Sequence, residues 1–216
     1  MPRGARLAFP NAFYHVFNRG TNKQPIFIND QDYRFFLEKL RQLQNKYDHS
    51  VYAYCLMPNH FHLSLRTRKT SVSKIMSSLA TSYSIYFNRT YGHFGPIFQN
   101  RFKSILVEND HYFLALARYI YLNPVKSSLV SDPLDYPYSS IREALKKEPL
   151  KILNQDQADL ISQTQKGIEG FQQFINAGIE EEMPEIKRLF EKEETVFGSE
   201  AFNTRSQKKY YRRKNA

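Results

Sequence analysis

The segment SVYAYCLMPNHFHLSLR, residues 50–66, has the pattern of two β-strands joined by a tight turn. Residues 50–57 are rich in β-branched and aromatic side chains, a proline and an asparagine follow as turn formers, and residues 60–66 alternate polar and apolar side chains. Because alternate residues of a strand share one face, His60 and His62 point to the same side. The segment therefore predicts a hairpin with one polar face and one apolar face turned towards helices.

Strand and helix patterns alternate on both sides of this hairpin. Aromatic and β-branched stretches predict strands, and apolar residues three and four apart predict helices. The expected elements are a strand over 12–20, a helix over 29–48, the two hairpin strands, a helix over 70–92, a strand over 96–107 and a helix over 109–123. This β-α-β-β-α-β order predicts an α+β fold, a ferredoxin-like antiparallel sheet with helices on one face.

Residues typical of helix ends flank the three expected helices. Asn29 or Asp30 is expected to cap the first helix, and Gly92 to close the second. Pro124 is expected to stop the third helix, since the residue before a proline disfavours helical geometry.

The composition of the chain predicts three parts. Residues 1–145 carry the strand and helix pattern of the main domain. Residues 146–205 have a helical pattern that becomes acidic, and we expect a helical extension there. Residues 206–216 are strongly basic and are expected to form a disordered tail.

Hydrophobic residues make up 41% of the chain and aromatic ones 15%, enough for a packed core. No apolar run is long enough to span a bilayer, and the first residues lack the apolar region of a signal peptide. The single cysteine, Cys55, excludes an internal disulfide and a cysteine zinc site. These features predict a cytoplasmic protein.

The positive charge is concentrated in the first two thirds of the chain. Of a net charge of +10, residues 1–150 hold 20 basic and 10 acidic side chains, whereas residues 151–216 hold 11 of each. A domain with this excess repels itself, and binding to a polyanion is the usual reason to retain it. Nucleic acid is the leading candidate, which would place the protein at the nucleoid.

Two histidines on one strand face form a candidate metal site. His60 and His62 can converge on a divalent cation, or they are polar residues of a solvated face. Tyr119 and Asn123 are four residues apart and share one face of the third helix. If that face covers the histidines, the Asn123 oxygen suits Mg²⁺ or Mn²⁺ as a third ligand. Tyr119 would then be a nucleophile on a phosphoryl group that the metal polarises, although most of the 15 tyrosines are expected to pack in the core.

Basic and polar residues near the strands are candidates for DNA contacts. Arg101 and Lys103 would share one face of the strand over 96–107 and could follow a phosphate backbone. The expected set, of which roughly half should touch DNA, is Asn18, Arg19, Arg66, Arg101, Lys103 and Lys126. The other histidines, His15 among them, have no partner at metal-binding spacing and are expected to be surface or hydrogen-bonded residues.

Three segments together resemble the IS200-like single-tyrosine transposases, and in particular their REP-associated branch. They are YHVFNRGTNKQPIF (14–27), LMPNHFHLSLR (56–66) and FQNRFKSILVENDHYFLALARYIYLNPVKSSLV (98–130). The resemblance covers residues 8–145. His-Phe-His at 60–62 matches the HUH motif of the family, and RYIYLNP matches its tyrosine helix. Many relatives have glutamine where this chain has Asn123.

The resemblance implies a metal-dependent DNA transesterase. His60, His62 and Asn123 would hold Mg²⁺ or Mn²⁺, and Tyr119 would attack the scissile phosphate of single-stranded DNA. The products would be a 5′-phosphotyrosine link and a 3′-hydroxyl that can reverse the reaction. Relatives act on hairpins with a single-stranded flank, as monomers or as homodimers. The alternatives are a catalytically silent hairpin-binding protein and an HUH nicking nuclease of the replication or relaxase type.

Overall fold

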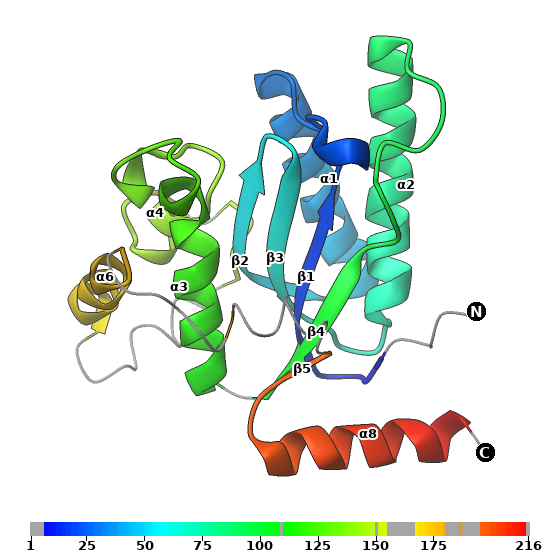
Figure 1. Ribbon diagram of the computed structural model, residues 1–216, viewed down its shortest axis with the longest axis vertical. Helices are drawn as coiled ribbons and strands as arrows, with labels where there is room; N and C mark the ends of the chain where they lie inside the picture. Colours follow the sequence, from blue (N-terminus) through cyan, green and yellow to red (C-terminus); the bar gives the residue numbers. More distant parts are fainter. Residues whose placement is uncertain are drawn as a thin grey trace.

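A five-stranded sheet in the order β2-β3-β1-β4-β5 forms the centre of the computed structural model (Figure 1). Its strands are β1 (Phe13–Arg19), β2 (Ser50–Met57), β3 (His60–Arg66), β4 (Lys103–Val107) and β5 (Val196–Phe197). The helices are α1 (Asp30–Tyr47), α2 (Val72–Tyr91), α3 (Asp110–Lys126), α4 (Ile141–Ala144), α6 (Gly167–Ala177) and α8 (Glu200–Lys214), with 3-10 turns at Thr21–Lys23 and Pro133–Asp135. The structure describes residues 7–108, 110–149, 151–154, 167–179, 186 and 195–214.

Strands β1 to β4 pair antiparallel, in the order expected of a ferredoxin-like sheet. The predicted α+β fold is therefore confirmed. β5 joins the edge of β4 in parallel, which makes the whole sheet mixed. The amide of Leu106 donates to the carbonyl of Thr195 (2.8 Å) and that of Glu108 donates to Phe197 (2.9 Å). The β5 segment thus covers strand groups of β4 that would otherwise be open to pairing with another chain.

The strand expected over 96–107 is shorter than predicted, because only Lys103–Val107 runs continuously beside β1. Before it, the chain forms bends and a single bridge, with the Gln99 amide donating to the Arg19 carbonyl (2.9 Å). Arg101 consequently lies in a bend rather than on a strand face.

Different helices cover the two faces of the sheet (Figure 1). On the apolar face, Phe36 of α1 packs against Phe61, with ring centroids 5.1 Å apart, and against Tyr83 of α2 at 5.2 Å. On the opposite face, Tyr119 of α3 packs against His62 at 5.5 Å. The predicted placement of the helices on one face holds for α1 and α2. α3 instead buries its apolar residues against the other face of the sheet.

Helix ends follow the predicted capping residues, with one exception. The Asn29 side chain caps α1 by accepting the amide of Gln31 (2.9 Å), and Gly92 ends α2 in the left-handed conformation (φ 59°). Pro124 does not stop α3, which continues to Lys126. Pro124 lacks the N–H of one helical hydrogen bond, and the helix ends two residues after it. The expected cap of α3 at Asn109 lies outside the described residues.

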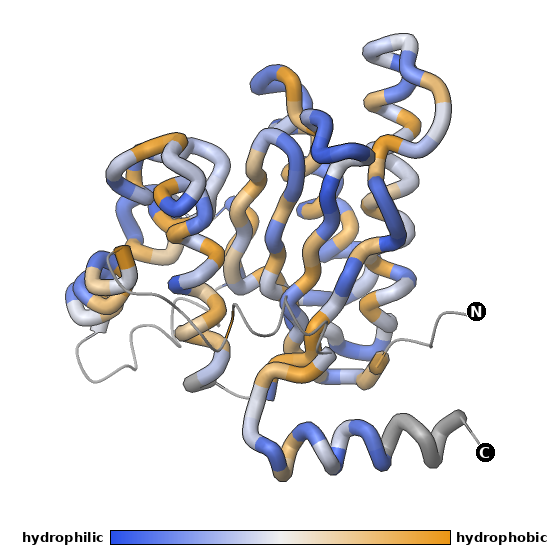
Figure 2. The backbone as a smooth tube through the Cα atoms, in the orientation of Figure 1, coloured by the Kyte–Doolittle hydropathy of each residue, from blue (hydrophilic) through white to orange (hydrophobic). Residues whose placement is uncertain are grey.

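The part of the chain after residue 145 adds helices to the main domain. α6 lies on the side of α3 that faces away from the sheet (Figure 1), and the guanidinium of Arg118 stacks on the Phe174 ring at 4.2 Å. α8 begins after Ser199, whose amide donates to Glu108 (2.6 Å), and most of its described length is hydrophilic (Figure 2). Since α8 runs to Lys214, residues 206–214 of the expected disordered tail are helical, as their arginine, lysine and glutamine content permits.

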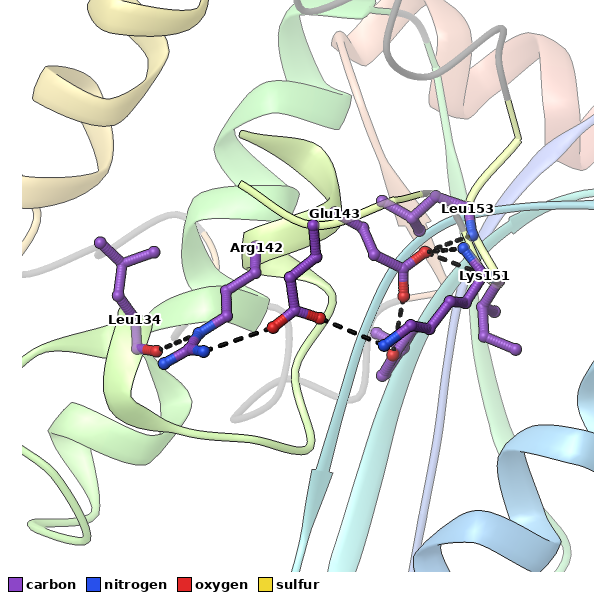
Figure 3. A network of polar contacts seen from close by, with 8 residues as sticks. Leu134, Arg142, Glu143, Lys151 and Leu153 are labelled. Atoms are coloured by element: carbon purple, nitrogen blue, oxygen red, sulfur yellow. Dashed lines mark hydrogen bonds and ion pairs between the residues drawn. The ribbon is translucent and has the colours of Figure 1, made fainter. Parts of the chain in front are cut away.

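A buried carboxylate holds the segment after α4 against β2. Glu143 is 3% exposed, and its Oε2 accepts the amides of Lys151, Ile152 and Leu153 at 2.8 to 3.1 Å (Figure 3). Its Oε1 accepts the hydroxyl of Tyr54 on β2 (3.1 Å). This network fixes residues 151–153 beside the edge strand β2.

Among the residues that the structure describes, no helix is both long enough and apolar enough to cross a membrane.

Candidate active site

The structure brings together the four residues that the sequence proposed as one site. His60 and His62 lie on β3 with ring centroids 5.1 Å apart, and the Tyr119 ring meets His62 edge-on at 5.5 Å. The Asn123 side chain acts on the pKa of both His60 and Tyr119, which places it beside these two residues. The face of α3 that carries Tyr119 and Asn123 therefore docks over the polar face of the hairpin.

The helical spacing of α3 determines which of its side chains reach the sheet. Asn123 lies one turn after Tyr119, and its Nδ2 donates to the Tyr119 carbonyl (2.8 Å). This bond anchors one end of the amide to the helix and leaves Oδ1 as the acceptor. Tyr121 points elsewhere, is fully buried, and accepts a hydrogen bond from Ser140 (3.3 Å), in agreement with the packing role expected of most tyrosines.

His60 has the tautomer that metal ligation requires. Its Nδ1 lies 2.6 Å from Oδ1 of Asn59. Because an amide oxygen only accepts, the proton sits on Nδ1, and Nε2 carries the lone pair. Burial, and then the positive charge of Arg19, lower the pKa of His60 to about 4 against the weaker opposing effect of Asn123. The ring is therefore neutral at physiological pH.

His62 lies against a third histidine that the sequence did not connect with the site. Nδ1 of His62 and Nε2 of His15 are 2.9 Å apart, and both residues are almost completely buried. Burial lowers the pKa of His15 to about 3, and burial together with the two neighbouring histidines keeps the pKa of His62 well below its usual value. His15 was expected to be either a surface residue or a hydrogen-bonded one, and the structure shows the second.

The donor set fits a divalent cation. Two neutral imidazoles and one amide oxygen suit a first-row divalent metal such as Mn²⁺, whereas Mg²⁺ would depend more on oxygens of the substrate or water to complete its octahedron. In the described part of the chain, no three His, Cys, Asp or Glu side chains gather as a metal site. Three protein ligands are therefore reached only by counting the amide of Asn123.

Tyr119 is protonated in its resting state. Burial raises the pKa of its hydroxyl to about 12, although the hydrogen bond with Asn123 acts in the opposite direction. A buried phenol next to two imidazoles can act as a nucleophile only if its proton leaves during the attack.

Two of the predicted DNA-contact residues share the sheet face of the histidines, and a third lies just before one of them in the chain. Arg19 is the cross-strand partner of His60, and its guanidinium donates to Gln99 at 2.9 and 3.1 Å. Lys103 is opposite Phe17 and therefore on the same sheet face as the histidines. Arg101 is exposed in the bend before β4. Arg19 and Lys103 thus place positive charge on the sheet face of the site.

The other three candidates have partners within the protein. Asn18 is 8% exposed and donates to the Asn100 carbonyl (3.1 Å). The Arg66 guanidinium stacks on the Phe13 ring at 5.1 Å, towards the far end of β3, and Lys126 donates to the Ile179 carbonyl (2.6 Å). The role of all six residues as DNA contacts stays a prediction, since Arg19 also has a partner within the protein in Gln99.

Sequence reasoning missed the role of His15 and of Asn59. The alternation of β1 places His15 on the face that His62 shares, but only the pairing register shows that the two rings meet. Asn59 is adjacent to His60 in the chain, and was considered only as a turn residue.

The comparisons with known proteins agree with this geometry. The family described as "Transposase IS200 like" matches residues 8–123. A Haemophilus influenzae protein named as a REP-associated tyrosine transposase is 27% identical over 124 residues, which are 52% of this chain and 70% of that protein. The solved structure of a REP-associated tyrosine transposase bound to a REP hairpin aligns with a TM-score of 0.57 and 19% identity, over 71% of this chain and 91% of its own. At this identity the structural match shows the fold alone.

Proposed function

Because this chain belongs to the IS200-like transposase family, we propose that it cleaves and rejoins single-stranded DNA through a covalent link to Tyr119. The convergence of Tyr119 and Asn123 with His60 and His62 carries this proposal. Residues from a strand and from a helix far along the chain meet in one place, with side chains of the types that the reaction needs. A scaffold that only bound DNA would not require this combination.

His60, His62 and Asn123 are the proposed ligands of Mg²⁺ or Mn²⁺. When bound, the cation would withdraw electron density from the scissile phosphate and make its phosphorus more electrophilic. The side-chain amide oxygen of Asn59 supports the lone pair on Nε2 of His60 by holding the proton on Nδ1.

Tyr119 is the proposed nucleophile. Its hydroxyl oxygen forms a bond to phosphorus as the bond from phosphorus to the 3′ oxygen breaks, which leaves a 5′-phosphotyrosine and a 3′-hydroxyl. The phenol loses one proton and the leaving oxygen gains one, so no net proton is consumed. One phosphodiester is exchanged for another, and the reverse step can therefore rejoin DNA without an external energy source.

The proposed substrate is a DNA hairpin with a single-stranded flank, and a solved structural neighbour is bound to a REP hairpin. Arg19 and Lys103 lie on the sheet face of the site and Arg101 lies in the exposed bend before Lys103, and we propose that all three contact the backbone of the flank. The substrate would be chromosomal DNA in the nucleoid.

Covalent adduct formation tests the proposal. Labelled hairpin oligonucleotides with a flank are incubated with the protein and Mn²⁺ or Mg²⁺, and the products are separated in SDS. We expect an SDS-resistant adduct from the wild type and from Tyr121→Phe, a control that removes a hydroxyl away from the site. Tyr119→Phe should give none. Hairpin binding with no wild-type adduct would instead identify a catalytically silent DNA-binding protein.

A further inference from the structure

We propose that His15 is a positioning residue that controls which nitrogen of His62 carries the proton. In this arrangement the Nδ1–H of His62 donates to Nε2 of His15, and Nε2 of His62 presents its lone pair to the site. The inference rests on the metal centre proposed above and adds a residue that is not one of its ligands.

The contact between the two rings allows only two arrangements. Nε2 of His15 and Nδ1 of His62 are 2.9 Å apart, so a single proton lies between them. Both rings are buried, at 1% and 4% exposure, and an imidazole that binds a metal is neutral, so it carries one N–H in total. If His62 donates, its Nε2 is a lone pair. If His15 donates, Nε2 of His62 carries a proton and cannot bind a cation.

His60 shows which arrangement suits the site. Its Nδ1–H is held by the oxygen of Asn59, so that its Nε2 carries the lone pair. With His62 donating to His15, both histidines of the HUH motif would present the same nitrogen in the same state. Metal-bound histidines commonly donate their second nitrogen to an acceptor that fixes the ring, and loss of that acceptor weakens metal binding about 10- to 100-fold.

The surroundings of His15 hold its ring in place. His15 lies opposite Ser64 and Ile105 in the register of β1. Its ring lies 5.0 Å from that of Phe17 and 6.1 Å, edge-on, from that of Tyr119. A ring packed in this way keeps its acceptor nitrogen aimed at His62 before any cation arrives, which makes the site preorganised.

The tautomer of His62 is the direct test. Nitrogen-15 NMR of the metal-free protein distinguishes a ring protonated on Nδ1 from one protonated on Nε2. We expect Nδ1–H at His62 in the wild type, and a change towards Nε2–H in His15→Phe, which keeps an aromatic ring but has no acceptor. Nε2–H at His62 in the wild type would overturn the proposal without any variant, as would an unchanged tautomer in a folded His15→Phe.

Metal affinity gives a second readout that does not depend on catalysis. Calorimetric titration with Mn²⁺ should show binding about 10- to 100-fold weaker for His15→Phe. His15→Gln should stay close to the wild type, because its amide oxygen can accept the Nδ1–H of His62. Equal weakening in both variants would overturn the proposal. Absence of a DNA adduct with the tautomer as expected would count against the proposed function and leave the role of His15 standing.

Discussion

His62 and Tyr119 pack edge to face, with ring centroids 5.5 Å apart, although one belongs to β3 and the other to α3. This contact is made within a single chain. It joins the proposed nucleophile to the proposed metal ligands without any contribution from a second copy.

The contact predicts that each molecule uses its own tyrosine. His62→Ala removes a proposed ligand and Tyr119→Phe removes the nucleophile, so each variant alone should form no adduct. An equimolar mixture should also form none, because neither variant contains a complete site. Adduct formation by the mixture, read on the same SDS gels, would mean that α3 is exchanged between molecules.

Asn123 is predicted to act through its amide oxygen. Asn123→Ala should weaken Mn²⁺ binding by at least about tenfold and abolish the adduct. Asn123→Gln should retain most of both, since a longer side chain can present the same oxygen. Calorimetry and the adduct assay measure these effects, with Asn45→Ala, an exposed change on α1, as the control. Full activity of Asn123→Ala would remove this residue from the ligand set.

Arg19 and Lys103 are predicted to contact phosphates of the single-stranded flank. Arg19→Gln and Lys103→Gln should each weaken binding to all flank sequences alike. Each should also lower the slope of log affinity against log salt by about 0.7. Arg34→Gln is the matched control, because Arg34 is an exposed residue of α1, the helix on the other sheet face. Fluorescence anisotropy across a salt series provides the slopes, and unchanged slopes in both test variants would contradict the assignment.

Buried His49 is predicted to make the fold sensitive to acid. Burial lowers its folded pKa to about 4, against weaker opposing effects of Asp48 and the Leu43 backbone, while the unfolded ring titrates near 6.5. Between these values the unfolded chain binds more protons, so stability falls as the pH drops from about 6.5 to about 4. The stability that is present at neutral pH and lost once the pH has fallen below about 4 is up to about 3 kcal/mol.

Urea unfolding at several pH values tests how much of the acid sensitivity is due to His49. Burial also lowers the pKa values of His15, His60 and His62. A variant of His49 should therefore keep the part of the pH dependence of stability that these three histidines cause. His49→Leu should lose less stability than the wild type between pH 7 and pH 5. An identical loss in both proteins would show that His49 is not protonated on unfolding in this range.

Glu143 is predicted to be a strong determinant of stability. Glu143→Ala would leave three backbone amides and the Tyr54 hydroxyl without their acceptor in a buried place (Figure 3). The expected loss is about 3 kcal/mol or more. Glu148→Gln, which affects only exposed ion pairs with Arg142 and Lys151, should change stability by less than about 1 kcal/mol. Similar unfolding midpoints for both variants would contradict this difference.

Local sequence patterns determined the strands, the helices and the order in which they occur. The period of two over residues 60–66 separated the histidines from the core, because this period depends only on strand geometry. The spacing of Tyr119 and Asn123 placed both on one helical face for the corresponding reason. The caps at Asn29 and Gly92 were equally predictable, since they satisfy backbone groups of their own helices.

Only the tertiary structure decided which surfaces meet. α3 docks on the sheet face opposite α1 and α2, β5 joins β4 from far along the chain, and Lys126 turns to the Ile179 carbonyl. The contact between His15 and His62 belongs to the same class, because it depends on the register between β1 and β3. Contacts of this kind are set by the burial of apolar surface across the whole fold, and a periodic pattern within one segment carries no information about its partner.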